Sequence, residues 1–138
     1  MTAPKGRIWP QNMHRRSARY KRNLVRKGEL LPEAEFCRQR GISRAQLALL
    51  LKRREAFAVT VKYRKCYPAV LAGPSLTRRR LTKLLEQLPP WLPPLIKYDL
   101  LTARRGSLGD KSPVQLVHRG DGYRRALRLV AWAQEEWR

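Results

Sequence analysis

Hydrophobic residues recur at helical spacing on both sides of a single glycine between residues 32 and 53. After the glycine, three leucines at positions i, i+3 and i+4 fall on one helix face: Leu47, Leu50 and Leu51. Ser43 precedes them as a favourable N-cap residue, and Gly41 can take the left-handed conformation that ends a helix. Pro32 is suited to the first turn of the earlier helix. The pattern predicts two helices joined by a short turn, which is the layout of a helix–turn–helix.

Alternating hydrophobicity follows the second of these helices. Residues 57–61 alternate and include β-branched side chains, so we expect a strand. The polar residues 62–65 would turn the chain, and Cys66 and Tyr67 would return as a second strand. Pro68 would end the pairing because proline lacks an amide hydrogen. A small hairpin with a cationic tip is therefore predicted.

Further helical patterns occupy the C-terminal half. Leucines spaced through residues 76–88 suit an amphipathic helix, and a second helix is expected over residues 95–103. Between them, the proline-rich residues 89–94 would form a rigid connection with Trp91 packed inward. Pro113 would begin a short helix from an N-cap at Ser112, and Gly120 would end it. The last helix would bury a row of mainly apolar side chains: Tyr123, Leu127, Val130, Ala131 and Trp137.

These elements predict a mainly helical protein of the α+β class, organised in three parts. Residues 1–28 would form a basic N-terminal arm, residues 29–73 a helix–turn–helix with a β-hairpin wing, and residues 75–138 a small helical module. Residues 13–27 favour helix through their Arg, Lys and Ala content, but their apolar residues are too sparse for a strong buried stripe. We expect this segment to be either a solvated tail or a helix that forms against a polyphosphate.

The charge of the chain indicates its class of partner. The 138 residues include 31 Lys and Arg against 10 Asp and Glu, which gives a formal net charge of +21. Self-repulsion of this size destabilises a compact state, so a polyanionic partner is expected. Residues 1–27 alone contain nine basic residues and no acidic one. With 43% hydrophobic residues, the chain nevertheless has enough apolar surface for a core, which excludes simple disorder.

Residues 35–47, which read Glu-Phe-Cys-Arg-Gln-Arg-Gly-Ile-Ser-Arg-Ala-Gln-Leu, resemble bacterial helix–turn–helix sequences, in which the turn often carries Gly-Ile-Ser or Gly-Val-Ser. Together with the hairpin and its terminal Tyr67-Pro68-Ala69, they are similar to the winged helix–turn–helix of MerR- and excisionase-like proteins. The resemblance implies that the helix after Ser43 enters the major groove of duplex DNA. It also implies that the hairpin tip lies beside phosphates or in a minor groove.

The candidate DNA contacts are polar side chains outside the leucine face, because Arg can pair bidentately with guanine and Gln with adenine. In the second helix they are Ser43, Arg44, Gln46, Lys52 and Arg53. In the hairpin they are Lys62, Arg64 and Lys65. In the arm, contacts to the DNA backbone are expected from Arg15, Arg16, Arg19, Lys21 and Arg22.

A second resemblance covers residues 99–137. The turn Leu-Gly-Asp-Lys-Ser-Pro at residues 108–113, followed by Gly120-Asp121 and a long last helix, is similar to the toxin-binding C-terminal domain of Xre/MbcA/ParS-type antitoxins. The resemblance implies a surface that binds a protein toxin or a second copy of the chain. Glu135 and Glu136 could address a cationic cleft there or could only solubilise the terminal turn.

Patterns typical of catalysis or metal binding are missing from the sequence. The aspartates are scattered, His14 and His118 lie far apart, and no phosphate-binding glycine loop is present, so we expect no enzyme activity, no cofactor and no metal. Cys37 and Cys66 are too few for a disulfide scaffold and are expected to be reduced thiols. No secretion signal or membrane-spanning stretch is recognisable, so we expect a cytoplasmic protein associated with the nucleoid.

The expected function is sequence-selective binding of double-stranded DNA, as a homodimeric transcriptional regulator of antitoxin type in a bacterium or a mobile element. Two alternatives remain open from the sequence. A toxin-neutralising interaction protein would use the C-terminal module chiefly to bind a protein. An RNA-binding or ribosome-associated protein would explain the charge of +21 without a helix–turn–helix.

Overall fold

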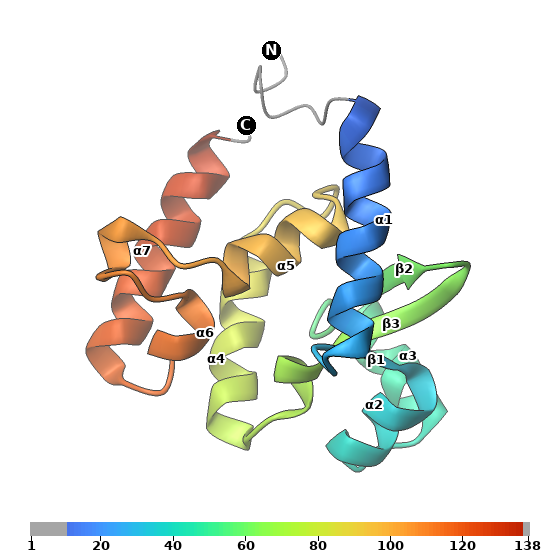
Figure 1. The fold of residues 1–138 in the computed structure, drawn as a ribbon. Coiled ribbons are helices and arrows are strands. Elements are labelled where there is room, and N and C mark those ends of the chain that lie inside the picture. Colours follow the sequence, from blue (N-terminus) through green and yellow to red (C-terminus); the bar gives the residue numbers. More distant parts are fainter. Residues whose placement is uncertain (1–10, 137–138) are drawn as a thin grey trace.

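A computed structural model describes residues 11–136 and shows a mainly helical α+β fold with a small antiparallel sheet (Figure 1). The α-helices in this range are α1 (Gln11–Arg26), α2 (Glu33–Arg40), α3 (Arg44–Lys52), α4 (Ser75–Glu86), α5 (Pro94–Thr102), α6 (Pro113–Leu116) and α7 (Gly120–Glu136). Two short 3₁₀ helices are η2 (Ala69–Ala72) and η3 (Gly106–Leu108). The strands are β1 (Leu30–Pro32), β2 (Val59–Val61) and β3 (Arg64–Pro68). The predicted fold class is confirmed at this level.

The sheet has the order β1-β3-β2 and includes a strand that the sequence did not predict. Strand β1 pairs with β3 in a register that joins Leu30 to Pro68, so Pro68 takes part in this pairing as the last residue of β3. The Ala69 amide donates to the Glu29 carbonyl at 2.9 Å, which makes the neighbouring Leu30–Pro68 pair a non-hydrogen-bonded one. Proline is tolerated there because no amide hydrogen is needed. Pairing between β2 and β3 does stop before it, at Cys66.

Helices α2 and α3 are joined by the short turn that the sequence predicts. Gly41 ends α2 with φ = +76°, and its amide donates to the Cys37 carbonyl at 2.8 Å. Ser43 is the N-cap of α3, as expected. Pro32 instead closes β1, so α2 begins one residue later than predicted. Phe36 packs on Tyr67 with ring centroids 5.3 Å apart, which fixes α2 against the sheet.

The hairpin turn is tighter than the predicted polar tip. Lys62 and Tyr63 have φ values of +49° and +68°, which indicates a two-residue turn of type I′. Arg64 and Lys65 belong to β3 and not to the turn. The tip itself therefore presents one cation and one tyrosine, whose side chain is fully exposed.

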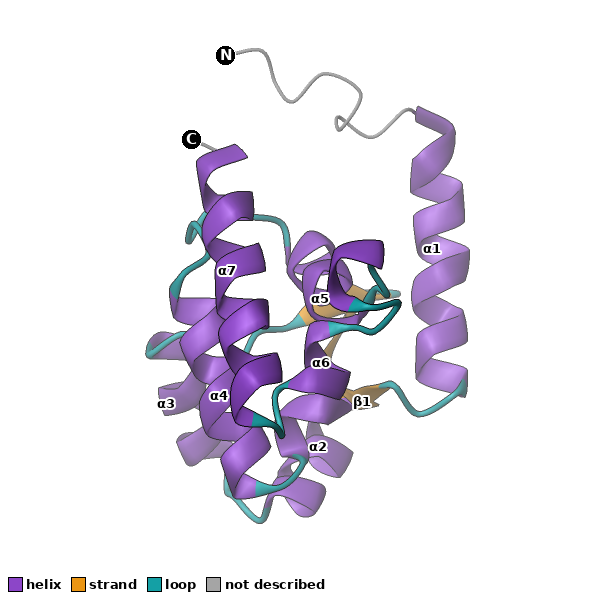
Figure 2. Ribbon diagram, turned by 90° about the vertical axis from the view of Figure 1, so that its left-hand side faces the viewer, coloured by secondary structure: helices purple, strands orange, loops and turns teal. Residues whose placement is uncertain are grey.

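Helix α1 matches the predicted helix over residues 13–27, but it is not a free arm. Leu24 is buried in the hydrophobic core, and Val25 packs against it. The C-terminal half of α1 lies against β1 and β2, while its other end stands away from the remaining helices (Figure 2). The segment is therefore helical, and its C-terminal half is anchored to the core.

The C-terminal half forms the second side of the same core. Leu81 and Leu84 of α4 are fully buried, whereas Leu76 is 45% exposed. Trp91 is 60% exposed, so the prediction that it packs inward is wrong. The turn between α4 and α5 contains three prolines, with Pro94 as the first residue of α5, and it carries the indole on its outer side. Buried side chains from Leu24 to Val130 belong to one cluster, so the three predicted parts share a core.

Ser112 caps α6 as predicted, with its hydroxyl accepting from the Gln115 amide at 3.2 Å. Gly120 does not end this helix, because α6 stops at Leu116 and Gly120 begins α7. Helix α7 buries Ala126 and Val130 fully, leaves Tyr123 and Leu127 partly buried, and exposes Ala131, contrary to the expected row. Trp137 lies outside the described residues.

Candidate nucleic-acid interface

One face of α3 belongs to the core and the opposite face is open. Leu47 is 2% exposed, and Leu50 and Leu51 pack against the core cluster, as the leucine spacing predicts. The residues on the opposite side of the helix are all exposed: Ala45, Ala48, Leu49 and Lys52. Their spacing of three and four residues places them on a single outward face. We call these four residues the outward face of α3.

Arg44 stands at the N-terminal end of α3. Its Nε atom lies 3.1 Å from Glu33 Oε2, and its side chain is 81% exposed. An exposed ion pair of this kind contributes roughly 0–1 kcal/mol, so a phosphate or a base can replace the carboxylate at little cost. Lys52 and Arg53 are exposed at the other end of the helix. Cations therefore flank the outward face at both ends.

Gln46 has a structural role at the start of α3. The side-chain Oε1 of Gln46 accepts a hydrogen bond from the Ser43 backbone amide at 2.7 Å. The backbone amide of Gln46 in turn donates to Ser43 Oγ at 3.1 Å. This reciprocal pair is a capping box, which satisfies two amides that a helix start otherwise leaves without partners. A bidentate contact to adenine would need the same Oε1 atom. Ser43 and Gln46 are thus occupied in shaping α3.

The cations of the hairpin lie in its turn and in the strand that follows it. Lys62, Arg64 and Lys65 are all exposed. Lys62 also lines a cavity of about 170 Å³ between the hairpin and α1, together with Lys21 and Arg22. The structure therefore brings part of the predicted arm set and part of the predicted hairpin set onto one continuous cationic surface.

The exposed side of α1 adds a second basic cluster. Arg19, Arg22 and Arg26 line a hollow of about 530 Å³ with Tyr20 and Asn23. Arg26 donates to the Asn23 side-chain oxygen, which holds one guanidinium in place. The side chains of Arg15 and Arg16 lie outside the described residues, although their backbone is helical.

Several other cations are structural. The Arg40 Nη1 donates to the Leu71 carbonyl at 2.7 Å, and burial, with the nearby charge of Arg78, lowers the pKa of Arg40. Arg80 donates to the Val117 carbonyl at 2.5 Å and thereby links α4 to α6. Lys97 lies 5.9 Å from the centre of the Phe57 ring. Some of the basic side chains that give the net charge of +21 therefore stabilise the fold through contacts within the protein.

Comparison with known proteins adds no relative. No family model matches the chain, and no curated protein or solved structure is significantly similar to it. The functional argument therefore rests on the residues and their geometry.

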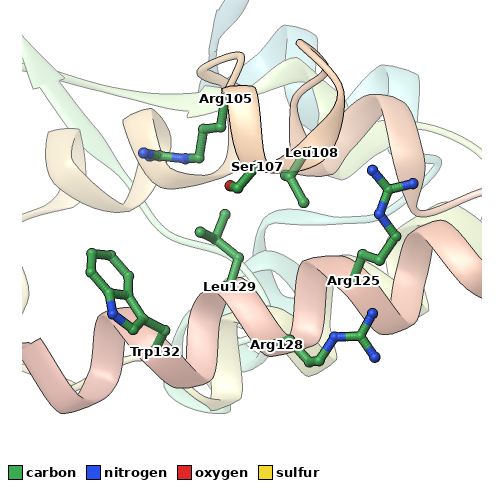
Figure 3. Close-up of a pocket in the computed structure, with 7 residues that line it drawn as sticks. All are labelled: Arg105, Ser107, Leu108, Arg125, Arg128, Leu129 and Trp132. Atoms are coloured by element: carbon green, nitrogen blue, oxygen red, sulfur yellow. The ribbon is translucent and has the colours of Figure 1, made fainter.

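The C-terminal half carries a cavity of about 650 Å³ (Figure 3). Leu129 and Trp132 of α7 form one wall, and Ser107 and Leu108 form the facing wall. Trp132 is 61% exposed. Three guanidiniums complete the lining, and no lining residue is acidic: Arg105, Arg125 and Arg128. The buried Nε of Arg105 has no hydrogen-bond partner within the described structure.

The described residues form no metal site and no disulfide bond. Among the described residues, no group of three or more His, Cys, Asp or Glu side chains is arranged to hold a metal ion. Cys37 and Cys66 are buried and unpaired, and burial raises the pKa of the Cys66 thiol. Within residues 11–136, no helix is both long and apolar enough to cross a bilayer.

The expected site residues omitted the three apolar members of the outward face: Ala45, Ala48 and Leu49. They were overlooked because only polar side chains were expected to contact DNA. Their positions were available from the sequence, since residues opposite Leu47, Leu50 and Leu51 must point away from the core.

Proposed function

We propose that the protein binds duplex DNA sequence-selectively and acts as a transcriptional regulator. In this proposal α2, α3 and the β2–β3 hairpin are a winged helix–turn–helix of the MerR- and excisionase-like kind. The observation that carries it is the open outward face of α3 between Arg44 at one end and Lys52 and Arg53 at the other. A helix of this exposure suits insertion into a major groove, with its flanking cations at phosphates.

The surface formed by α1 and the hairpin would supply further phosphate contacts. Lys21, Arg22 and Lys62 lie around one cavity, so the two elements can follow the same stretch of DNA backbone. These contacts fix position and give affinity without sequence preference. Such a protein would act on the bacterial nucleoid in the cytoplasm and would need no cofactor.

The test is selection of bound sequences from a pool of random duplex DNA, followed by measurement of affinity at several salt concentrations. If about six phosphates are contacted, log K should fall against log salt with a slope of about −5. A common motif and a steep slope would support the proposal. Equal recovery of all sequences, or tighter binding to RNA of the same sequence, would contradict it and favour the RNA-binding alternative.

A second proposal concerns the cavity on α7. Trp132 is exposed and Leu129 is partly buried next to three guanidiniums, so the cavity leaves apolar surface open to a partner. We infer that this surface joins two copies of the chain, because a two-fold dimer would present two α3 helices to paired half-sites. The resemblance to antitoxin domains makes a protein toxin the competing occupant.

Sedimentation of the full chain with Trp132→Ala tests the dimer. We expect the dimer dissociation constant to rise at least tenfold, while Trp91→Ala, which removes a comparably exposed indole elsewhere, leaves it unchanged. A chain that is monomeric at all concentrations would contradict the dimer and leave the toxin-like partner.

A further inference from the structure

The outward face of α3 is apolar at its centre. Ala45, Ala48 and Leu49 are exposed there, and Leu49 is 48% exposed. Leu49 lies on the side of the helix away from the buried Leu47, so it does not belong to the core cluster. Together with Ala45 and Ala48, Leu49 gives the centre of this face an apolar surface that the core does not use.

Hydrogen-bonding groups are few on this face. Gln46 uses its carbonyl oxygen in the capping box with Ser43. Arg44 lies at the edge of the face and is paired with Glu33. Among the four residues of the outward face, only Lys52 has a polar side chain. Discrimination between bases by paired hydrogen bonds is therefore not what the centre of this helix is built for.

One base edge in the major groove is apolar, and it is the C5-methyl group of thymine. Alanine and leucine side chains can bury such a methyl group, whereas they offer nothing to the polar edges of guanine or cytosine. The cations at both ends of the helix fit phosphates on the two sides of a groove. An apolar protein surface would not explain this arrangement of Arg44, Lys52 and Arg53, which favours duplex DNA as the occupant.

We propose that α3 selects its DNA site through thymine methyl groups, with Leu49 as the principal contact and Ala45 and Ala48 beside it. This inference rests on the proposed function and specifies the chemistry of its recognition step. The target half-site accordingly contains thymines at the positions that α3 covers.

The experiment replaces each thymine of the selected site in turn by deoxyuridine, which lacks only the methyl group. At each contacted position we expect the affinity of the full-length protein to fall about fourfold, since burying one methyl-sized group is worth about 0.8 kcal/mol. A second arm replaces a contacted thymine by cytosine and then by 5-methylcytosine. The methylated base should recover part of the lost affinity because its methyl group stands at the same ring position.

Leu49→Ala assigns the effect to this helix. For this variant, replacing thymine by deoxyuridine at one position of the site should change the affinity much less than it does for the parent protein. The slope of log K against log salt should stay unchanged. Leu76→Ala is the matched control, because Leu76 is 45% exposed on α4 and should leave all thymine effects intact. Both substitutions shorten an exposed side chain, so both variants should remain folded.

The outcomes separate the inference from the proposed function. Selective binding that ignores every thymine methyl would overturn the inference alone. Leu49→Ala that changes the oligomeric state and leaves the deoxyuridine effects unaltered would also overturn it, because the face would then be a protein contact. Absence of any selective duplex binding would overturn the inference and the proposed function together.

Discussion

Replacing Gln46 with Glu keeps the acceptor oxygen of the capping box and removes the amide group that a contact to adenine requires. In the structure, this oxygen accepts from the Ser43 amide at 2.7 Å. Glutamate serves equally well at this position of a capping box, and its charge near a helix N-terminus is favourable by about 0.3–1 kcal/mol. We therefore expect Gln46→Glu to unfold at the same or a higher denaturant concentration.

Gln46→Ala is the matched variant that loses the box. The Ser43 amide is exposed and can be hydrated, so the loss should be about 0.5–1 kcal/mol in the free energy of unfolding. Urea denaturation followed by circular dichroism resolves this difference. The parent protein and Gln46→Glu should thus both have a higher free energy of unfolding than Gln46→Ala.

DNA binding then distinguishes the two roles of Gln46. A glutamine paired to adenine would contribute roughly 1–3 kcal/mol of discrimination, which is about 5–150-fold. We expect Gln46→Glu to weaken binding to selected and random duplexes alike, since its carboxylate repels phosphates, and to keep the ratio of the two affinities within about twofold. Fluorescence anisotropy at one fixed salt concentration measures that ratio. A loss of preference at one adenine position in Gln46→Glu would show that Gln46 reads a base, and equal stability of Gln46→Ala and the parent protein would refute the capping role.

Gly122→Ala should lower the free energy of unfolding by about 1–3 kcal/mol, because the new Cβ would lie 2.4 Å from the Leu116 carbonyl oxygen. Urea denaturation should show no such loss for the control Gly120→Ala, whose Cβ would meet only the end of the Arg124 side chain at 3.7 Å. Burial raises the pKa of Tyr98 well above 10, so the contribution of its neutral phenol to the free energy of unfolding is fully present below pH 10 and is lost as the pH rises further. Tyr98→Phe should therefore make the fall in stability at alkaline pH less steep when unfolding is measured at a series of pH values. Lys62→Asn should keep the positive-φ turn and make the slope of log K against log salt shallower by about one; an unchanged slope would remove the hairpin from the interface.

Local signals account for the parts of the fold that the sequence predicted. Gly41 and Ser43 define the turn between α2 and α3 through conformational and capping preferences that act within a few residues. Strand β1 was not predictable in this way, because Leu30–Pro32 is short and acquires its structure only by pairing with residues 66–68. Trp91 was misplaced for a related reason. Its exposure depends on how the proline-rich turn leaves the core, and hydrophobicity carries no information about that direction.

The candidate site was predictable only in part. Arg44, Lys52 and the hairpin cations are exposed as their charge suggests. The capping role of Gln46 was also present in the sequence, since Ser followed three residues later by Gln before an apolar run is the signature of a capping box. The contact between α1 and the hairpin could not be predicted from the sequence, because it depends on the long-range packing of α1 against β2.

Leu24 anchors α1 to the hydrophobic core. A segment that orders only on binding loses about 1–2 kcal/mol of backbone entropy per residue at that moment, and a preformed helix avoids this loss. In the proposed complex with DNA, the cations of α1 would therefore form a fixed array, and electrostatic attraction would accelerate encounter without a folding step in between. In a calorimeter, binding should show only the modest negative heat-capacity change of rigid surfaces in contact, and the helical circular dichroism of the protein should not increase when DNA is added.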